Sequence, residues 1–303
     1  NTWLDDIQAY PDGADPVEAL AALGRRRGLA RPALERDGWF VSPALAGRID
    51  AALGRGPLPD GSGLLAPLRA VKSAAELEAI RAAARYAQAG LAAGLDACAA
   101  GTDENAVAAA MLAAATAAGS EAMAMEPLVA SGPRSGLPHM TWRRRRLEPG
   151  DAVFLELAGS HARYHAALMR SVWIGPPPDE ASRMMDCALR ALDAALDAIR
   201  PGHPCSAPHE AAQAVIDAAG YGPAFRKRIG YSMGVAFAPD WGEGGLLSLF
   251  TGEDRPIEPG MVFHLPATLR RYGAWTVGAS ETVIVTASGA EPLSDLPRTL
   301  SLR

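Results

Sequence analysis

The chain has 303 residues, of which 49% are hydrophobic and 21% charged, with a net charge of −5 and a pI near 5.7. These proportions are typical of a globular protein, and the acidic balance argues against nucleic acid as a partner. No apolar run approaches the roughly 18 residues that a membrane helix needs, and three scattered cysteines do not indicate a disulfide framework. We therefore expect a cytoplasmic protein that binds neither nucleic acid nor membranes.

The first 68 residues are rich in proline and glycine, and their turn signals predict a small, irregular α/β segment that buries little core of its own. Because the chain begins at Asn1, we expect this segment to be the end of a longer domain. The capping-box pattern from Ser73 to Glu76 then predicts a long helix to about Ala99. A second helix is expected from about residue 101 to 119.

The rest of the chain predicts strands and a second pair of helices. Two strands, 153–157 and 163–174, are expected on either side of a turn at Gly159-Ser160. Further helices are predicted over 179–199 and 207–219, and further strands over 228–237, 261–269 and 274–286.

An internal repeat relates the two halves of this region. The segment from Leu147 to Phe154 recurs from Ile257 to Phe263, and Arg170–Ile174 is echoed by Glu281–Val285. Each copy follows a helix pair, which predicts two similar halves about a pseudo-two-fold axis with a cleft between them.

Two carboxylates lie in otherwise apolar strands, where a charge is costly unless it is paired or functional. Glu156 lies in the first half and Glu281 in the second. If both face the cleft, they form a site for a cation, a metal or an amidinium group. The alternative for Glu156 is a structural ion pair with Arg170 on the next strand.

Three histidines are candidates for acid–base or structural roles. His139 lies in a loop between Pro138 and Trp142, where it is either simply solvated or held as a general acid or base. His165 and His264 lie on strands, where structural roles are equally expected.

The loop from Asp240 to Gly244 places two acids, Asp240 and Glu243, around the aromatic ring of Trp241. It is either a plain surface turn or a site for a small cation, because a ring face and a carboxylate both stabilise positive charge. No P-loop, dinucleotide fingerprint, nucleophile elbow or Cys/His zinc spacing is present in the sequence.

The repeat, its Glu-Pro-Gly-x-Val-Phe phrases and the segment 280–286 resemble the pita-bread superfamily of methionine aminopeptidases, Xaa-Pro dipeptidases and creatinase. The resemblance implies an α+β fold with a pseudo-two-fold repeat, as a catalytic domain over residues 69–303. Residues 1–68 would be the C-terminal part of the smaller N-terminal α/β domain that creatinase carries. It also implies a homodimer.

Peptidases of this superfamily hold two metal ions with two aspartates, one histidine and two glutamates. The resemblance places these five positions on Glu156, Ala167, Tyr231, Pro266 and Glu281. Because three of the five side chains cannot replace a ligand, we expect no metal, no cofactor and no metallopeptidase activity.

The chain is more specifically similar to the metal-free branch. Creatinase has a loop histidine that matches His139, and bacterial ectoine hydrolases resemble segments 138–142, 154–159, 163–166, 230–231, 239–243 and 295–298. This resemblance implies the opening of a cyclic amidine, ectoine, to an N-acetylated diaminobutyrate. Glu156 would act as nucleophile or base, His139 would move the proton, and Glu281 would hold the amidinium. The other expected substrate contacts are Trp142, Tyr164, His165, Arg170, Tyr231, Trp241, Glu243 and His264.

Two other functions stay open on the sequence. Ectoine hydrolases carry an additional glutamate where this chain has Gly278, which leaves a guanidino compound or another amidine as the alternative substrate. The third possibility is a non-catalytic pita-bread module that binds a peptide or protein.

Overall fold

The computed structural model describes residues 4–54 and 56–303, and the chain divides into two compact units, up to Leu68 and from Arg69. This division falls at the position where the composition changes. A short helix, α3 (Ala66–Ala70), crosses it. Within the described ranges, every helix is too short or too polar to cross a bilayer.

The first unit is mainly helical, with α1 (Pro16–Arg27) and α2 (Pro43–Leu53), each begun by a side-chain cap and a proline in its first turn. Its small core centres on Val17, Ile49 and Leu58. The expected α/β character is wrong for the part described, 4–54 and 56–68, where the β content is one isolated bridge, Leu34 to Asp60. The segment has too few buried apolar side chains to support a sheet.

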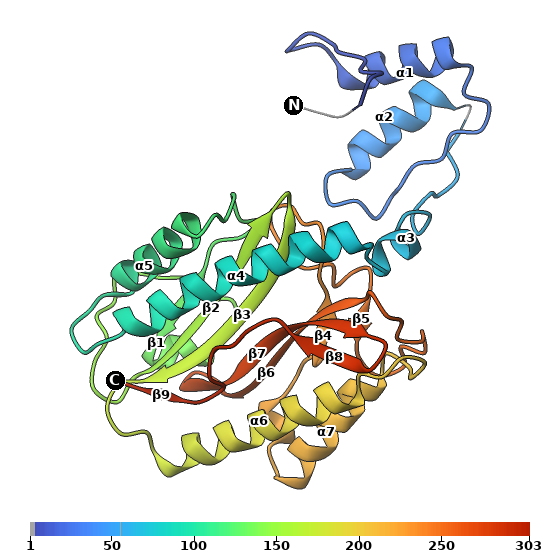
Figure 1. Ribbon diagram of the computed structural model, residues 1–303. Helices are drawn as coiled ribbons and strands as arrows, with labels where there is room; N and C mark the ends of the chain where they lie inside the picture. Colours follow the sequence, from blue (N-terminus) through green and yellow to red (C-terminus); the bar gives the residue numbers. More distant parts are fainter. Residues whose placement is uncertain (1–3, 55) are drawn as a thin grey trace. The chain divides into compact units, whose positions relative to one another are not determined.

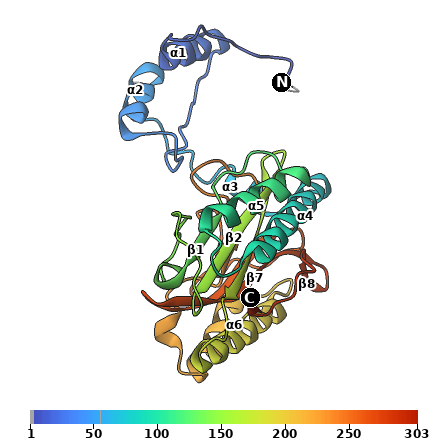
Figure 2. The ribbon, with the colours of Figure 1, turned by 90° about the vertical axis from the view of Figure 1, so that its left-hand side faces the viewer.

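The second unit opens with the predicted helix pair, α4 (Ala74–Ala97) and α5 (Glu104–Ala117). Ser73 and Glu76 form the capping box that begins α4. The pair covers a sheet in the order β1-β2-β3-β9 (Figures 1 and 2). Its strands are β1 (Leu128–Ser131), β2 (Ala152–His161), β3 (Tyr164–Trp173) and β9 (Ser301–Leu302). A short 3-10 helix, η1 (Gly132–Gly136), follows β1.

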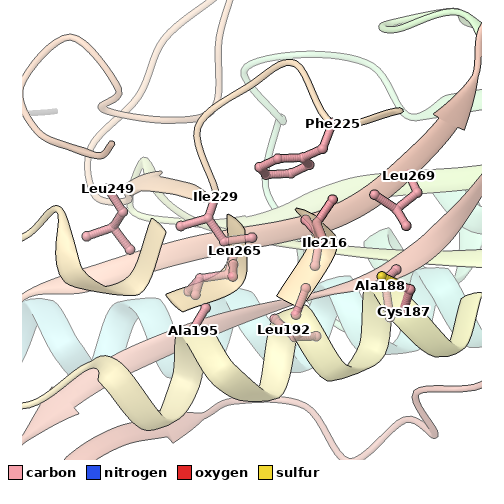
Figure 3. Packing of buried hydrophobic residues seen from close by; sticks show 14 of the residues in the cluster. Cys187, Ala188, Leu192, Ala195, Ile216, Phe225, Ile229, Leu249, Leu265 and Leu269 are labelled. Atoms are coloured by element: carbon pink, nitrogen blue, oxygen red, sulfur yellow. The ribbon is translucent and has the colours of Figure 1, made fainter. Parts of the chain in front are cut away.

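The second half repeats this plan. Helices α6 (Asp179–Ala198) and α7 (Ala207–Ala218), followed by the 3-10 helix η2 (Gly222–Ala224), pack on a sheet in the order β5-β4-β6-β7-β8. Leu192 of α6, Ile216 of α7 and Leu265 of β6 meet in their shared core (Figure 3). The strands are β4 (Gly230–Ser232), β5 (Ser248–Leu249), β6 (Val262–Arg271), β7 (Trp275–Thr286) and β8 (Gly289–Pro292).

Backbone hydrogen bonds confirm the predicted repeat. The Gly150 amide before β2 donates to the carbonyl of Ile174 at 2.7 Å, and the equivalent Gly260 amide before β6 donates to Val285 at 2.8 Å. Both glycines have positive φ, 95° and 91°. The two halves therefore share one hydrogen-bonded frame, and the expected α+β architecture is confirmed.

The predicted turn at Gly159-Ser160 is wrong, because both residues lie inside β2 and the hairpin turns at Ala162 and Arg163. Gly159 is required for a different reason. A Cβ at this position would lie 2.1 Å from the carbonyl oxygen of Ala83, so the glycine lets α4 lie directly on the strand.

We expect Gly159→Ala to destabilise the protein by about 3 kcal/mol, because neither the strand nor the helix backbone can move away without cost. Urea denaturation measures this effect. Gly245→Ala is the matched control, since a Cβ there meets no atom within 4 Å. Equal stability of the two variants would show that the helix is not held against the strand at this point.

Candidate active site

The second unit contains a cavity of about 530 Å³ between strands β2, β4 and β6 and the loops beside them. Along β6, every second residue from Pro266 to Arg270 faces it. The alternate residues, which include Leu265 and Leu269, face the core shown in Figure 3. Its side chains fall into three groups. The cations are Arg226, Lys227, Arg228 and Arg270; the apolar and aromatic wall includes Pro138, Phe154, Tyr231, Phe250, Pro266 and Tyr272; the acid–base groups are Glu156 and His139.

Glu156 is the carboxylate that lines this cavity. The residue is only 7% exposed, and within the described part of the chain its carboxylate receives no hydrogen bond. Burial raises its pKa to about 7, against the opposing charges of Lys227 and Arg270. A carboxyl group that titrates near neutrality and faces open space is suited to acid–base or nucleophilic chemistry.

Lys227 lies beside this carboxylate, half-buried, and its ammonium donates a hydrogen bond of 2.5 Å to the carbonyl of Pro266. Burial lowers the pKa of Lys227 to about 7, and the charge of Arg270 acts in the same direction.

Pro266 leaves its carbonyl free for this contact. Met233 donates to Val262 on the β4 side, and Val285 donates to Met261 on the β7 side, so even-numbered residues of β6 point their backbone groups toward β4. Proline has no amide hydrogen to extend the β4 ladder. This accounts for the start of β4 at 230, where the sequence predicted 228. The strand also ends at 232, five residues before its predicted end at 237.

A hydrogen-bonded chain runs behind the cavity wall. The indole of Trp241 donates to the hydroxyl of Tyr231 at 3.1 Å, and that hydroxyl bonds Nδ1 of His264 at 2.9 Å. Nε2 of His264 lies 2.7 Å from Oγ of Ser280. Burial lowers the pKa of His264 to about 3, so the ring is neutral and can accept from Tyr231 and donate to Ser280.

His139 is placed in the cavity wall as expected. Its backbone has a positive φ of 54°, an uncommon conformation for a residue that is not glycine. Desolvation, helped by the charges of Arg270 and Lys227, lowers the pKa of His139, so its ring is neutral at pH 7 and can accept a proton.

The structure corrects the assignments of Glu281 and Arg170 to the substrate. Glu281 is 1% exposed and pairs with Arg170 at 2.8 Å in the core between the sheets. Arg170 also donates to the carbonyls of Met169, Ser280, Leu296 and Pro297, which leaves nothing to offer a ligand. Its partner is therefore Glu281, while the alternative pair with Glu156 is wrong.

Other expected substrate contacts also point away from the cavity. The hydroxyl of Tyr164 donates to Glu76 on α4. His165 is fully buried, accepts from the Ala124 amide and contacts the Arg163 carbonyl. Trp142 packs against the core beneath α5, and His264 acts only through Tyr231. The resemblance could not separate these roles, because cavity and core residues alternate along the same strands.

The loop expected to bind a cation is closed to one. Glu243 pairs with Lys72 at 2.9 Å and with Arg69 at 2.6 Å, so its charge is already compensated. Trp241 is 2% exposed and packs behind Tyr231. Tyr231 itself does line the cavity, which agrees with its expected role.

The strand register also corrects the last metal-ligand position. Ser280 lies opposite Pro266 and shares its face, whereas Glu281 lies opposite Leu265 on the other face. The five positions on the cavity side are therefore Glu156, Ala167, Tyr231, Pro266 and Ser280, with one carboxylate among them. Across the described residues, no group of three or more His, Cys, Asp or Glu side chains is placed to hold a metal. This donor set does not fit a metal pair.

A family model described as metallopeptidase family M24 matches residues 78–287. The chain belongs to this family. It is 33% identical over 185 residues to an ectoine hydrolase of Halomonas elongata, which covers 61% of this chain and 46% of that protein. An uncharacterized hydrolase/peptidase of Sinorhizobium fredii is 31% identical over 300 residues, 95% of this chain and 73% of that protein.

Among solved structures, an X-Pro aminopeptidase from Thermotoga maritima superposes with a TM-score of 0.87 at 26% identity, over 96% of this chain and 79% of that one. The pita-bread α+β fold of family M24 is therefore the fold of this chain. The chain spans less than half the length of the ectoine hydrolase that it matches.

Proposed function

We propose that this M24 protein hydrolyses a C–N bond in a small carboxylated amide or cyclic amidine, and that it does so without the metal pair of its family. The observation that carries the proposal is Glu156, a buried carboxylate that faces the cavity without a hydrogen-bond partner in the described chain. The loss of the other acidic positions beside it supports metal independence. The similarity to an ectoine hydrolase supports a cyclic amidine.

In this reaction water adds across the C–N bond, its OH to carbon and its proton to nitrogen. Ionised Glu156 attacks the carbon directly, or it removes a proton from the water that attacks. Lys227 and Arg270, whose charges act on Glu156, stabilise the negative charge that develops on an amide oxygen or on the nitrogen of an unprotonated amidine. Neutral His139 carries the proton to the departing nitrogen.

The test is proton NMR of ectoine incubated with metal-stripped protein in excess chelator. We expect the ring signals to be lost and those of an acetylated diaminobutyrate to grow, at a rate that added metal changes less than twofold. Turnover only after metal addition would contradict the proposed mechanism. Hydrolysis of a guanidino compound instead of ectoine would keep the chemistry and change the substrate. No hydrolysis of either, together with capture of a peptide, would identify a binding module.

A further inference from the structure

The cavity carries more positive charge than its own acids can balance. Its lining holds four cations, Arg226, Lys227, Arg228 and Arg270, and one carboxylate, Glu156. Within the described residues, none of the four forms an ion pair with an Asp or Glu side chain.

Cations buried elsewhere in the same unit do have acidic partners. Lys72 pairs with Glu243 at 2.9 Å, and Arg170 pairs with Glu281 at 2.8 Å. The cavity cations are less buried, since Lys227, Arg228 and Arg270 are half-buried and Arg226 is exposed. Four positive side chains without acidic partners around one cavity favour an anionic ligand.

The four cations form two groups. The inner pair, Lys227 and Arg270, is the one whose charges act on Glu156. The outer arginine pair is Arg226 and Arg228. Their guanidinium carbons lie 5.1 Å and 4.9 Å from the ring centroids of Tyr272 and Tyr231, respectively.

Stacking fixes each guanidinium plane against the wall of the cavity and leaves its edge, which carries the N–H donors, available. Arg226 donates through Nε to the Pro223 carbonyl, which leaves its terminal nitrogens for a ligand. In the described chain, Arg228 makes no hydrogen bond to protein at all. A carboxylate is the group that such planar donors bind best.

We propose that the substrate carries two anionic groups, one near Lys227 and Arg270 and a second held by the outer arginine pair. This inference rests on the proposed function and narrows its substrate to a dicarboxylate amide or amidine. Ectoine has one carboxylate and a positively charged ring, so it leaves the outer arginine pair without a counter-charge and would be a poorer substrate than a dicarboxylate. A dianion compensates two of the three positive charges that remain when Glu156 is ionised.

Binding tests this without depending on turnover. Isothermal titration at low ionic strength compares glutarate with pentanoate, which has the same five carbons and one carboxylate. We expect glutarate to bind the wild-type chain at least tenfold more tightly, and Arg228→Gln to remove that advantage while leaving pentanoate unchanged. Arg271→Gln is the matched control, because Arg271 pairs with Glu180 at the surface and lies outside the cavity lining. Arg226→Gln should reproduce the effect of Arg228→Gln.

Equal affinity for the two probes, or equal weakening of both in Arg228→Gln, would overturn the inference. Thermal denaturation of each variant checks that the fold is retained. A dicarboxylate preference with no hydrolysis of any amide or amidine would support this inference and contradict the proposed function. Hydrolysis of ectoine with unchanged kcat/KM in Arg228→Gln would support the proposed function and contradict this inference.

Discussion

Glu156→Gln lowers kcat/KM at least a thousandfold, because an amide neither attacks carbon nor removes a proton from water at neutral pH. The substitution keeps the size of the side chain and fills the same space beside Lys227 and Arg270. Activity of the wild-type chain should rise as pH increases toward 7, because Glu156, with a pKa raised by burial to about 7, reacts in its ionised form. It should fall again at higher pH as Lys227, with a pKa lowered to about 7, loses its charge. Initial rates across pH 5 to 9 measure both effects.

The same variant should be more stable than the wild-type chain in alkaline solution. Burial raises the pKa of Glu156 from 4.5 to about 7, so the folded state holds the proton more tightly than the unfolded state does. Between those pH values the wild-type stability contributed by this group falls as pH rises. Glutamine removes that dependence, and we expect a gain of about 3 kcal/mol at pH 8 and less than about 1 kcal/mol at pH 5.

Urea denaturation at the two pH values measures this difference. Glu148→Gln is the control, because the Glu148 side chain is 73% exposed and should change neither rate nor stability. More than a tenth of the wild-type activity in Glu156→Gln would exclude Glu156 as the reacting group. Equal stability at pH 8 would show that its carboxylate is solvated in the folded protein.

Arg170→Met should destabilise the protein by about 3–5 kcal/mol, the usual cost of breaking a buried ion pair from one side. Glu281 would then be a buried charge without a counter-ion, and one of its oxygens, Oε2, already lacks a hydrogen-bond partner within the described chain. The side chain of Arg170, in β3, would also no longer donate to the carbonyl of Ser280 in β7 or to that of Leu296 before β9. The free energy of unfolding in urea measures the loss.

The double variant Arg170→Met, Glu281→Leu is the matched comparison. It removes both charges, so we expect it to recover at least 1 kcal/mol of the stability that the single variant loses. A stable Arg170→Met chain with weakened substrate binding would instead restore the sequence-based assignment of Arg170 to the substrate.

Most of the architecture was predictable because its signals are local. Helix caps, Glu-Pro-Gly phrases and helix pairs located both halves of the second unit, and the repeat even aligned Arg170 with Glu281, the two residues that pair across it. The side of the sheet toward which each of these side chains points was not predictable. One position along a strand reverses the direction of a side chain, so Glu281 and Ser280 exchange places between cavity and core according to register.

The cationic wall was missed for a different reason. Arg226 to Arg228 lie between the short helix after α7 and strand β4, in a segment without the periodicity that would orient them. Arg270 did carry a signal, since period two from Pro266 places it on the cavity face. Placing Arg270 on that face required knowing that the strand continues to Arg271, two residues beyond its predicted end.

The hydrogen bond from the Lys227 ammonium to the Pro266 carbonyl holds a positive charge in the cavity wall whether or not a ligand is bound. With a pKa near 7, that charge is exchangeable with solvent. An anion that enters the cavity stabilises the ammonium form and so draws a proton from the buffer, while a cation releases one. Anion affinity and proton concentration are thus thermodynamically linked, and the pH of the surrounding solution sets how strongly this protein holds an anion.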